Sequence, residues 1–265
     1  TALHDLRPRG VIIHALGEEV TTLGPNTLMS QRSISFEISF NLWSPPPGGT
    51  TTAGGTLQAG ETSPAHADKL PKGEHDFPFE FALPPALPPT FSGEFTRIVY
   101  LIAAKVDLPL QADIHHEHPF TVLPEPLTET PRPVRAAVQS PHGVRAELAL
   151  NASSFYPGDH VQGTLQVTGA ESITLTAAIV EIVSREKAEA HEFADHFDKV
   201  RVRAEIDPAR LSGGQPFPID LPIPEDADPS FVGRHSAKSR LVRARIDCAT
   251  APSIIAEAVI RVGAK

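Results

Sequence analysis

Residues 77–93 read FPFEFALPPALPPTFSG, and residues 217–233, which lie 140 positions later, read FPIDLPIPEDADPSFVG. The ungapped match continues on both sides of this segment and covers residues 73–117 of the first copy. Self-similarity over such a length indicates that one structural unit occurs twice in the chain.

The repeated segment begins with aromatic residues that alternate with other residues. Alternation with a period of two predicts a strand whose rings face one core, and its proline would sit where no ladder N–H is needed. We expect the glycine that closes each copy to take a turn conformation that other residues resist. The motif consists of Phe77, Pro78, Phe79, Phe81 and Gly93 in the first copy, and of Phe217, Pro218 and Gly233 in the second.

The composition agrees with a strand-rich protein. Of the 265 residues, 27 are proline, about twice the average usage, which excludes a mainly helical fold. Alternating apolar residues mark further strands at 34–42, 161–167 and 200–206. The predicted fold is all-β, with two tandem immunoglobulin-like antiparallel β-sandwiches related by internal duplication.

Composition shifts suggest where the domains begin and end. We expect an N-terminal sandwich over 1–126, a proline-rich linker over 127–134, and a C-terminal sandwich over 135–265. The offset between the copies is 168 rather than 140 near their starts, so the first copy carries an insertion. The segment 44–72 is rich in Pro, Gly, Thr and Ser and is expected to be a mobile loop.

The repeat also predicts a missing part of the first copy. The opening strands of the second copy, near 144–167, map to positions before Thr1. We therefore expect roughly 25 to 30 further residues before Thr1, cleaved, disordered or supplied by another chain.

Charge and cysteine content exclude some classes of protein. A net charge of -9 with a pI near 5.7 argues against broad nucleic-acid binding. The single cysteine, Cys248, cannot form an intramolecular disulfide, which fits a reducing compartment. No apolar run is long enough to span a membrane, and no signal peptide is visible.

Several ordered motifs resemble the arrestin superfamily, and the resemblance is closest to the N-terminal domain of arrestin-domain-containing (alpha) proteins. The motifs are residues 70–85, 89–93 and 97–107 in the first copy, and 155–167 and 214–224 in the second. The resemblance implies a cytoplasmic, non-catalytic adaptor or scaffold in membrane trafficking or signalling, with protein partners and with peripheral membrane association as a further option.

Two related roles remain open under the same resemblance. The chain could be a constitutive subunit of an assembly, like the retromer arrestin-like subunit, or a bacterial regulator like the sporulation-control protein. Its partners would be cargo tails for an adaptor and assembly subunits for a constitutive subunit. The ligase-docking PPxY element of alpha-arrestin tails is absent from this sequence, and the phosphate-sensing polar core of receptor-binding relatives has no identifiable residues in it.

Basic residues supply the candidates for binding a partner or an anion. Lys199, Arg201 and Arg203 alternate with apolar residues and are expected to line the outer face of one strand. Arg243 and Arg245 are expected to share a face in the same way. Such stripes could contact phosphorylated tails or lipid phosphates. The alternative is a solvated sheet face neutralised by neighbouring carboxylates.

The sequence HHEH at 115–118 supplies the candidate for a metal site. On a strand, His116 and His118 share one face and could offer two imidazoles to a metal that other residues complete. The alternative is an exposed hairpin end. The sequence contains no nucleophile elbow, P-loop or dinucleotide motif, so we predict neither an enzyme nor a cofactor.

Overall fold

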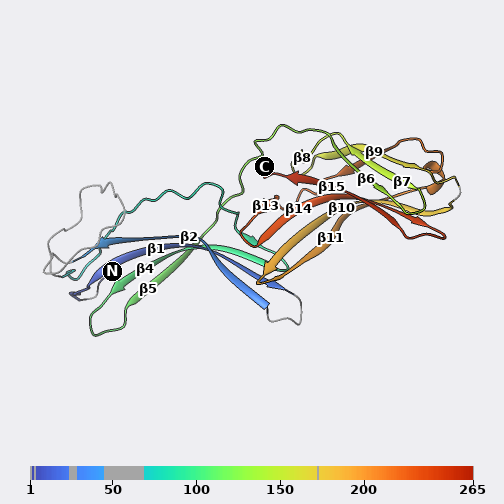
Figure 1. Ribbon diagram of the computed structural model, residues 1–265. Coiled ribbons are helices and arrows are strands. Elements are labelled where there is room, and N and C mark those ends of the chain that lie inside the picture. The colour runs from blue at the N-terminus through green and yellow to red at the C-terminus, as the bar shows by residue number, and fades with distance from the viewer. Residues whose placement is uncertain (1, 3, 24–28, 45–68, 172, 265) are drawn as a thin grey trace. The chain divides into compact units, whose positions relative to one another are not determined.

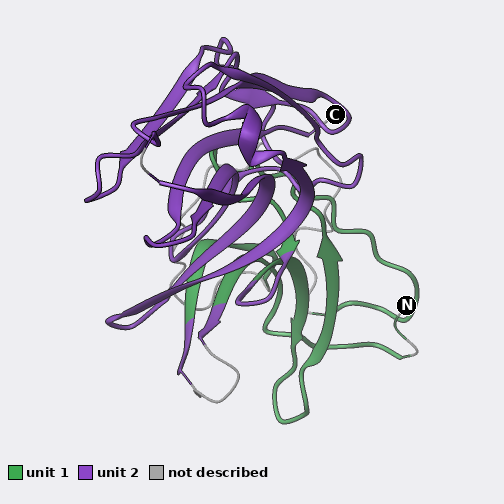
Figure 2. Ribbon diagram, turned by 90° about the vertical axis from the view of Figure 1, so that its right-hand side faces the viewer, with its two compact units in different colours: residues 1–20, 32–91, 97–122 green, residues 21–31, 92–96, 123–265 purple. Residues whose placement is uncertain are grey.

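The computed structural model describes residue 2 and residues 4–23, 29–44, 69–171 and 173–264 (Figure 1). Regular structure in these residues consists of β-strands and one short 3-10 helix, Pro208–Arg210. This confirms the all-β prediction. The chain forms two compact units, coloured separately in Figure 2: the first comprises 1–20, 32–91 and 97–122, and the second comprises 21–31, 92–96 and 123–265.

The second unit is a sandwich of two sheets. The larger sheet has the order β11-β10-β14-β15-β8, with β13 paired to β14, and the smaller has the order β12-β9-β7-β6. Among the described residues of this unit, the strand pairings are antiparallel except that of β15 with β8. The strands of the larger sheet are β8 (Ser154–Phe155), β10 (Leu175–Ala190), β11 (Phe193–Ile206), β13 (Phe231–Val232), β14 (Ser236–Cys248) and β15 (Ile254–Val262). Those of the smaller sheet are β6 (Val134–Gln139), β7 (Arg145–Leu150), β9 (His160–Thr168) and β12 (Phe217–Pro222).

The core of the second unit lies between these two sheets. Leu148 and Leu165 come from the smaller sheet, and Val180, Val242 and Ile260 from the larger; all five are fully or almost fully buried. Because successive strand residues point to opposite faces, the positions between them on β10, β14 and β15 must lie on the other side of the larger sheet. We call that side the outer face.

The remaining strands form one sheet, most of which belongs to the first unit; residues 21–23, 29–31, 92 and 96 of these strands belong to the second unit. Its order is β2-β1-β4-β3, with β5 paired to β4. The strands are β1 (Gly10–Leu23), β2 (Met29–Trp43), β3 (Phe91–Ser92), β4 (Thr96–Asp107) and β5 (Ile114–Phe120). The connections match those of β10, β11, β13, β14 and β15 in the second unit, as the duplication requires.

Equivalent hydrogen bonds confirm the duplication at atomic detail. The Thr90 amide donates to the Val122 carbonyl at 3.0 Å, and the Ser230 amide donates to the Val262 carbonyl at 2.7 Å. In return, the amides of Val122 and Val262 donate to the hydroxyls of Thr90 and Ser230 at 2.9 and 3.0 Å. Both pairs are related by the 140-residue offset read from the sequence.

The aromatic motif of the first copy matches that of the second in sequence but differs from it in secondary structure. Residues 217–222 form β12 because they pair with β9, whereas residues 77–81 are extended without belonging to a strand. The prediction of a strand there is wrong. The described part of the first unit offers no strand equivalent to β9, and an extended segment without a partner has no ladder to join.

The rings of this segment nevertheless pack against the sheet of the first unit. The Phe81 ring lies 6.4 Å from that of Phe36 and 6.0 Å from that of Phe40, between centroids. Phe77 packs beside the small cluster of Val11, Trp43 and Leu70, and Phe79 stacks on Phe81 at 6.3 Å while remaining 38% exposed. The predicted inward orientation is therefore right for Phe77 and Phe81 and wrong for Phe79, which is exposed.

The reason predicted for the glycines is also wrong. Neither Gly93 nor Gly233 has a positive φ, although each amide closes the same turn by donating to the carbonyl of Thr96 or Ser236, at 2.8 and 2.7 Å. A Cβ added to Gly93 would lie 2.1 Å from a carboxylate oxygen of Glu186. Close approach of that carboxylate, rather than backbone conformation, favours glycine at position 93.

Most of the predicted insertion at 44–72 lies outside the described residues, which resume at Lys69. Its predicted end extends too far, because Leu70 is 3% exposed and its amide and carbonyl bond to those of Leu6 at 2.8 Å. Residues 69–72 therefore belong to the folded part of the first unit.

Candidate functional site

The outer face of the larger sheet presents side chains in rows that cross β11, β10, β14 and β15. The register between neighbouring strands defines each row, because cross-strand partners point to the same side of a sheet. The aliphatic row is Val200, Val183, Leu241 and Val259, and the charged row beside it is Arg203, Glu181, Arg243 and Glu257. The charged row alternates in sign from strand to strand.

The aliphatic row is buried at its centre and exposed at its ends. Val183 and Leu241 are 0% and 2% exposed, whereas Val200 and Val259 are 47% and 58% exposed. Ionic contacts that join residues on the two sides of the row cover its centre. The outer strands β11 and β15 therefore present apolar side chains to solvent on either side of a charged surface.

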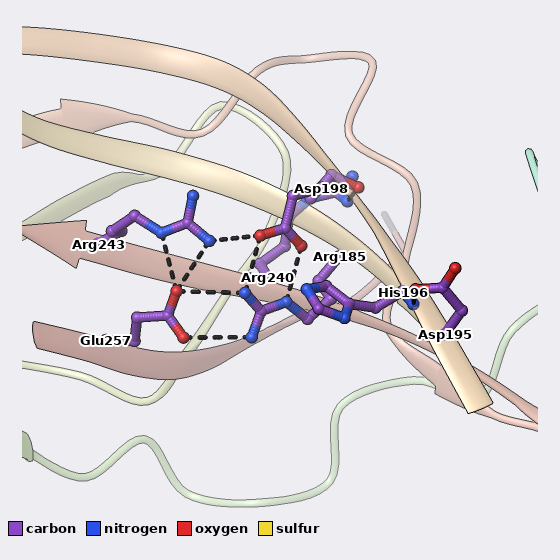
Figure 3. A network of polar contacts seen from close by, with 8 residues as sticks. Arg185, Asp195, His196, Asp198, Arg240, Arg243 and Glu257 are labelled. Atoms are coloured by element: carbon purple, nitrogen blue, oxygen red, sulfur yellow. Dashed lines mark hydrogen bonds and ion pairs between the residues drawn. The ribbon is translucent and has the colours of Figure 1, made fainter. Parts of the chain in front are cut away.

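Four charged residues form an ion network over this row (Figure 3). The Arg185 guanidinium donates to both oxygens of Asp198 at 2.7 Å and to those of Glu257 at 3.1 and 3.2 Å. Arg243 donates to Glu257 at 2.8 Å and also to Asp198. Two cations and two anions, one from each of four neighbouring strands, thus neutralise one another.

Hydrogen bonds within the ion network hold its members in their charged forms. The bond from Arg185, opposed by burial and assisted by Arg243, lowers the pKa of Asp198 to about 2. Burial acts to raise the pKa of Glu257, but bonds from Arg243 and Arg185 outweigh it and keep that pKa below its usual value. The bond to Asp198 raises the pKa of Arg185.

The predicted stripe of Lys199, Arg201 and Arg203 does not exist as one surface. Lys199 pairs with Ser184 and Arg203 pairs with Glu181, and these partners lie three positions apart on β10, so they face opposite sides of the sheet. The register shifts at this point, which leaves Arg201 as the extra residue of a β-bulge. The prediction of a shared face is therefore wrong.

Two members of that stripe are also paired with carboxylates. Arg201 donates to Asp226 at 2.6 Å, and Arg203 donates to Glu205, on its own strand, at 3.1 Å. Lys199 lies exposed on the side of β11 opposite to Arg203.

The prediction that Arg243 and Arg245 share a face is right. Arg243 pairs with Glu181 and Glu257, and Arg245 pairs with Ile179 and Ile255 in the next row of the outer face. The two arginines differ in their surroundings, because Arg243 belongs to the ion network and Arg245 does not.

His116 and His118 share a face of β5, as predicted, through pairing with Ala104 and Ile102 of β4. Both side chains are exposed. Within the described residues, no group of three or more His, Cys, Asp or Glu side chains is placed to hold a metal ion. The structure therefore adds no ligand to the two imidazoles.

A buried carboxylate that no sequence motif indicated lies on the core side of β10. Glu186 is 2% exposed and accepts bonds from the amides of Glu94, Phe95 and Thr96 at 3.0, 2.9 and 2.8 Å. The Lys238 ammonium lies 3.7 Å from the same carboxylate. Glu186 thereby fixes the 93–96 turn within the second unit.

Neither the Glu186 contacts nor the ion network could be recognised from local sequence. The residues that bond to Glu186 lie at least 90 positions away, and Arg185 and Glu257 are 72 positions apart. The available signal is weak: the strand contains charged residues at 181, 185, 186, 187 and 189, and nothing in its own sequence distinguishes the two that are bonded across the sheet. Only the cross-strand register assigns their partners.

The fold and the site define a class of protein. It is all-β and internally duplicated, it has two units, and one of its sheets carries a charged surface whose ions neutralise one another. The family model for the arrestin (or S-antigen) N-terminal domain matches residues 54–126. The chain is 32% identical over 161 residues to arrestin domain-containing protein 17 of Caenorhabditis elegans, a match that covers 55% of this chain and 38% of that protein. It is 51% identical over 45 residues to arrestin domain-containing protein 1 of Rattus norvegicus and 49% identical over 45 residues to that of Homo sapiens, in each case about a tenth of the relative.

Together with the fold, these matches support the resemblance of the chain to the arrestin superfamily. It spans well under half the length of the curated relatives it matches. Among the described residues, no helix is long and apolar enough to cross a membrane.

Proposed function

We propose that the chain is a non-catalytic adaptor that binds protein partners through the outer face of the second unit. Its setting would be the cytoplasm, in membrane trafficking or signalling. The exposed ends of the aliphatic row, together with Ile255 at 45% exposure, are the observation that carries the proposal. Exposed aliphatic side chains on a regular sheet face offer apolar surface that contact with a protein partner would bury.

The ion network supports binding rather than chemistry. A general acid or base works best when its pKa lies near the operating pH. Bonds to Arg185 and Arg243 move the pKa values of Asp198 and Glu257 away from neutrality. These carboxylates therefore stay ionised and hold a fixed surface, which suits recognition better than proton transfer.

The arrestin relatives support the adaptor role at the level of the family. The names of these relatives describe arrestin domain-containing proteins and specify no partner. The constitutive-subunit role predicts a stable complex instead of a transient one. Size-exclusion chromatography of the native protein distinguishes them, because a subunit elutes with its partners and a transient adaptor elutes alone.

Val259→Asp tests the proposed surface. Placing a charge on this exposed position should weaken partner capture by about tenfold or more. It should change the free energy of unfolding by less than about 0.5 kcal/mol, since the site is at the surface. Quantitative capture from cells with the full-length protein, followed by mass spectrometry, provides the measurement.

Leu123→Asp is the matched control, because Leu123 is 76% exposed and lies outside every strand. It should leave capture unchanged. Equal partner recovery by wild type and Val259→Asp would contradict the proposed surface, and turnover of a substrate by purified protein that captures no partner would contradict the adaptor role.

A further inference from the structure

β11 forms one edge of the larger sheet in the second unit. Among the described residues, β10 is the strand that pairs with it, and its other edge has no partner strand. All of residues 193–200 are exposed except Asp198, which is half-buried. An edge strand presents unpaired backbone N–H and C=O groups, so this free edge is a surface onto which a further strand can add.

Backbone groups at alternate positions of β11 point to the free edge. The His196 amide donates to the Asp195 carboxylate at 2.7 Å, so it points away from β10. In an antiparallel pair, the N–H and C=O of one residue point to the same side, and those of the next residue point to the other. The groups of residues 194, 196, 198 and 200 are therefore the ones that an added strand would bond.

The neighbouring strand gives the same alternation. The Glu189 amide donates to the His235 carbonyl at 2.7 Å, on the side of β14. Lys187, two positions earlier, points its backbone groups the same way and is the register partner of His196. The pair of Lys187 and His196 is thus not hydrogen-bonded, which leaves the groups of His196 to the free edge.

Two exposed ions on this edge lack an opposite charge. Asp195 and Lys199 are both exposed, and within the described residues neither forms an ion pair. They point to the same side of β11 but lie four residues apart, about 13 Å along the strand, which is too far for them to pair with each other. A second, antiparallel copy of β11 with Phe197 opposite its own equivalent would set Asp195 of each copy opposite Lys199 of the other.

The outward-pointing backbone groups agree with this register. His196 faces Asp198 of the other copy, and Ala194 faces Val200, which is 47% exposed. All four residues point their N–H and C=O groups to the free edge, so these are hydrogen-bonded pairs. The regular pairing ends at the β-bulge formed by Arg201.

Phe197 lies on the two-fold axis of this pairing. Its backbone groups point to β10, so it forms a non-hydrogen-bonded pair with its equivalent, in which side chains approach closely. The ring packs against that of Phe95 at 6.2 Å between centroids, yet Phe197 is still 38% exposed. Contact between the two Phe197 rings would bury this remaining apolar surface.

Other registers do not match the charges. Cross-strand partners point to the same side of a sheet, so the axis of such a pairing passes through a residue rather than between two residues. An axis at Asp195, Asp198 or Lys199 sets two like charges opposite each other, which is destabilising. An axis at His196 sets Asp195 opposite Phe197 and leaves the ions unpaired. Among residues 195–199, the axis at Phe197 is the one that pairs them.

We propose that the second unit dimerises with a second copy of this chain through the free edge of β11, with Phe197 on the two-fold axis and Asp195 paired with Lys199 across it. A strand of another protein would have to bring a cation opposite Asp195 and an anion opposite Lys199 at this spacing, whereas the chain itself supplies both. The axis is perpendicular to the sheet, so both outer faces lie on the same side of the dimer. The inference goes beyond the proposed function and does not depend on it.

Sedimentation equilibrium of the untagged full chain measures this dimer. The paired segment is short compared with a standard interface, so we expect a Kd between about 10 μM and about 1 mM. Lys199→Glu and Asp195→Lys should each weaken the dimer about fivefold or more, because each sets like charges opposite at two symmetric places. Both positions are exposed, so neither change should affect folding.

Mixing the two variants tests the register itself. In a mixed dimer, one copy carries an anion at both positions and the other a cation at both, so opposite charges again face each other. An equimolar mixture should dimerise within about twofold of wild type, as should a variant with both changes. A folding defect would not recover on mixing. Arg135→Glu is the matched control, because Arg135 is 77% exposed on β6 of the smaller sheet, and it should leave the Kd unchanged within about twofold.

A disulfide tests the position of the axis. In a Cys248→Ser background, Phe197→Cys should form an intermolecular disulfide on mild oxidation, because its equivalent lies directly opposite. Glu205→Cys, exposed on the same strand, should not.

A chain that stays monomeric up to about 1 mM would overturn the inference, even if this edge captured a strand of another protein. So would a dimer that neither charge reversal weakens, variants that do not recover on mixing, or a disulfide from Glu205→Cys and none from Phe197→Cys. The proposed function is measured separately by Val259→Asp, because β10 and β14 separate β15 from β11.

Discussion

Replacing Glu186 with alanine is expected to destabilise the second unit by about 3–5 kcal/mol, the largest effect of any substitution considered for this protein. The carboxylate is 2% exposed and accepts three backbone bonds, and its removal leaves three amides without their acceptor. Each unsatisfied buried donor costs about 1–3 kcal/mol, with partial compensation by water. Denaturant unfolding measures the total.

Hydrogen exchange of individual backbone amides shows where in the second unit the destabilisation by Glu186→Ala occurs. The amides of Glu94, Phe95 and Thr96 should exchange faster in Glu186→Ala than in wild type. Glu186→Gln should give an intermediate result, because it retains one carbonyl acceptor. Unchanged exchange at these three amides would show that the carboxylate does not hold the turn.

Gly93→Ala probes the same contact from the other side. The added Cβ would lie 2.1 Å from the Glu186 carboxylate, so the carboxylate must move and its backbone bonds weaken. We expect a cost of about 2 kcal/mol in the wild-type background and less than about 0.5 kcal/mol in the Glu186→Ala background. Equal costs in both backgrounds would contradict this account of Gly93.

The second large effect concerns the ion network and depends on pH. Asp198→Asn should lower the free energy of unfolding by about 2 kcal/mol at neutral pH, because it removes the anion that both arginines bond. The network lowers the pKa of Asp198 to about 2, below its value in the unfolded chain. A lowered pKa contributes stability that is fully present above the unfolded value, near 4, and is lost as the pH falls toward 2.

The difference between wild type and Asp198→Asn should therefore be constant above about pH 5 and shrink between about pH 4 and pH 2. Unfolding curves for both proteins across this range provide the measurement. Asp220→Asn is the control, because Asp220 bonds His160 and Gln162 on the smaller sheet, outside the network. A wild-type advantage over Asp198→Asn that grows as the pH falls would contradict the assigned role.

The repeat predicted the architecture well because two copies of similar sequence are expected to form the same strands in the same order. The 140-residue offset correctly relates β3, β4 and β5 to β13, β14 and β15, down to the bonds between Thr90 and Val122. The same offset misled at 77–81, because a strand requires a partner strand as well as its own alternation. Phe217 joins β12 because β9 lies beside it, and Phe77 has no such neighbour in the described residues.

The candidate site was predicted in part. Alternation placed Arg243 and Arg245 on one face, which is correct because β14 is regular there. The same reasoning failed for Lys199 and Arg203, because a β-bulge at Arg201 adds one residue and reverses the faces beyond it. No periodicity in a single strand reveals such a bulge.

Partners across the sheet were beyond prediction for a similar reason. The roles of Asp198 and Glu257 depend on which strands become neighbours in the sheet. These strands lie far apart in the sequence, so the residues around each carboxylate do not indicate its partner. The carboxylates that bond Arg243 likewise come from β11 and β15.

The central claim is that the outer face binds the partner. Photo-crosslinking from this face tests that claim most directly. A benzoylphenylalanine placed at position 259 of the full-length protein should crosslink in cells to one segment of a partner protein. The same photoreactive residue at position 123 should not. Crosslinks to partners that form from position 123 and are absent from position 259 would contradict the claim.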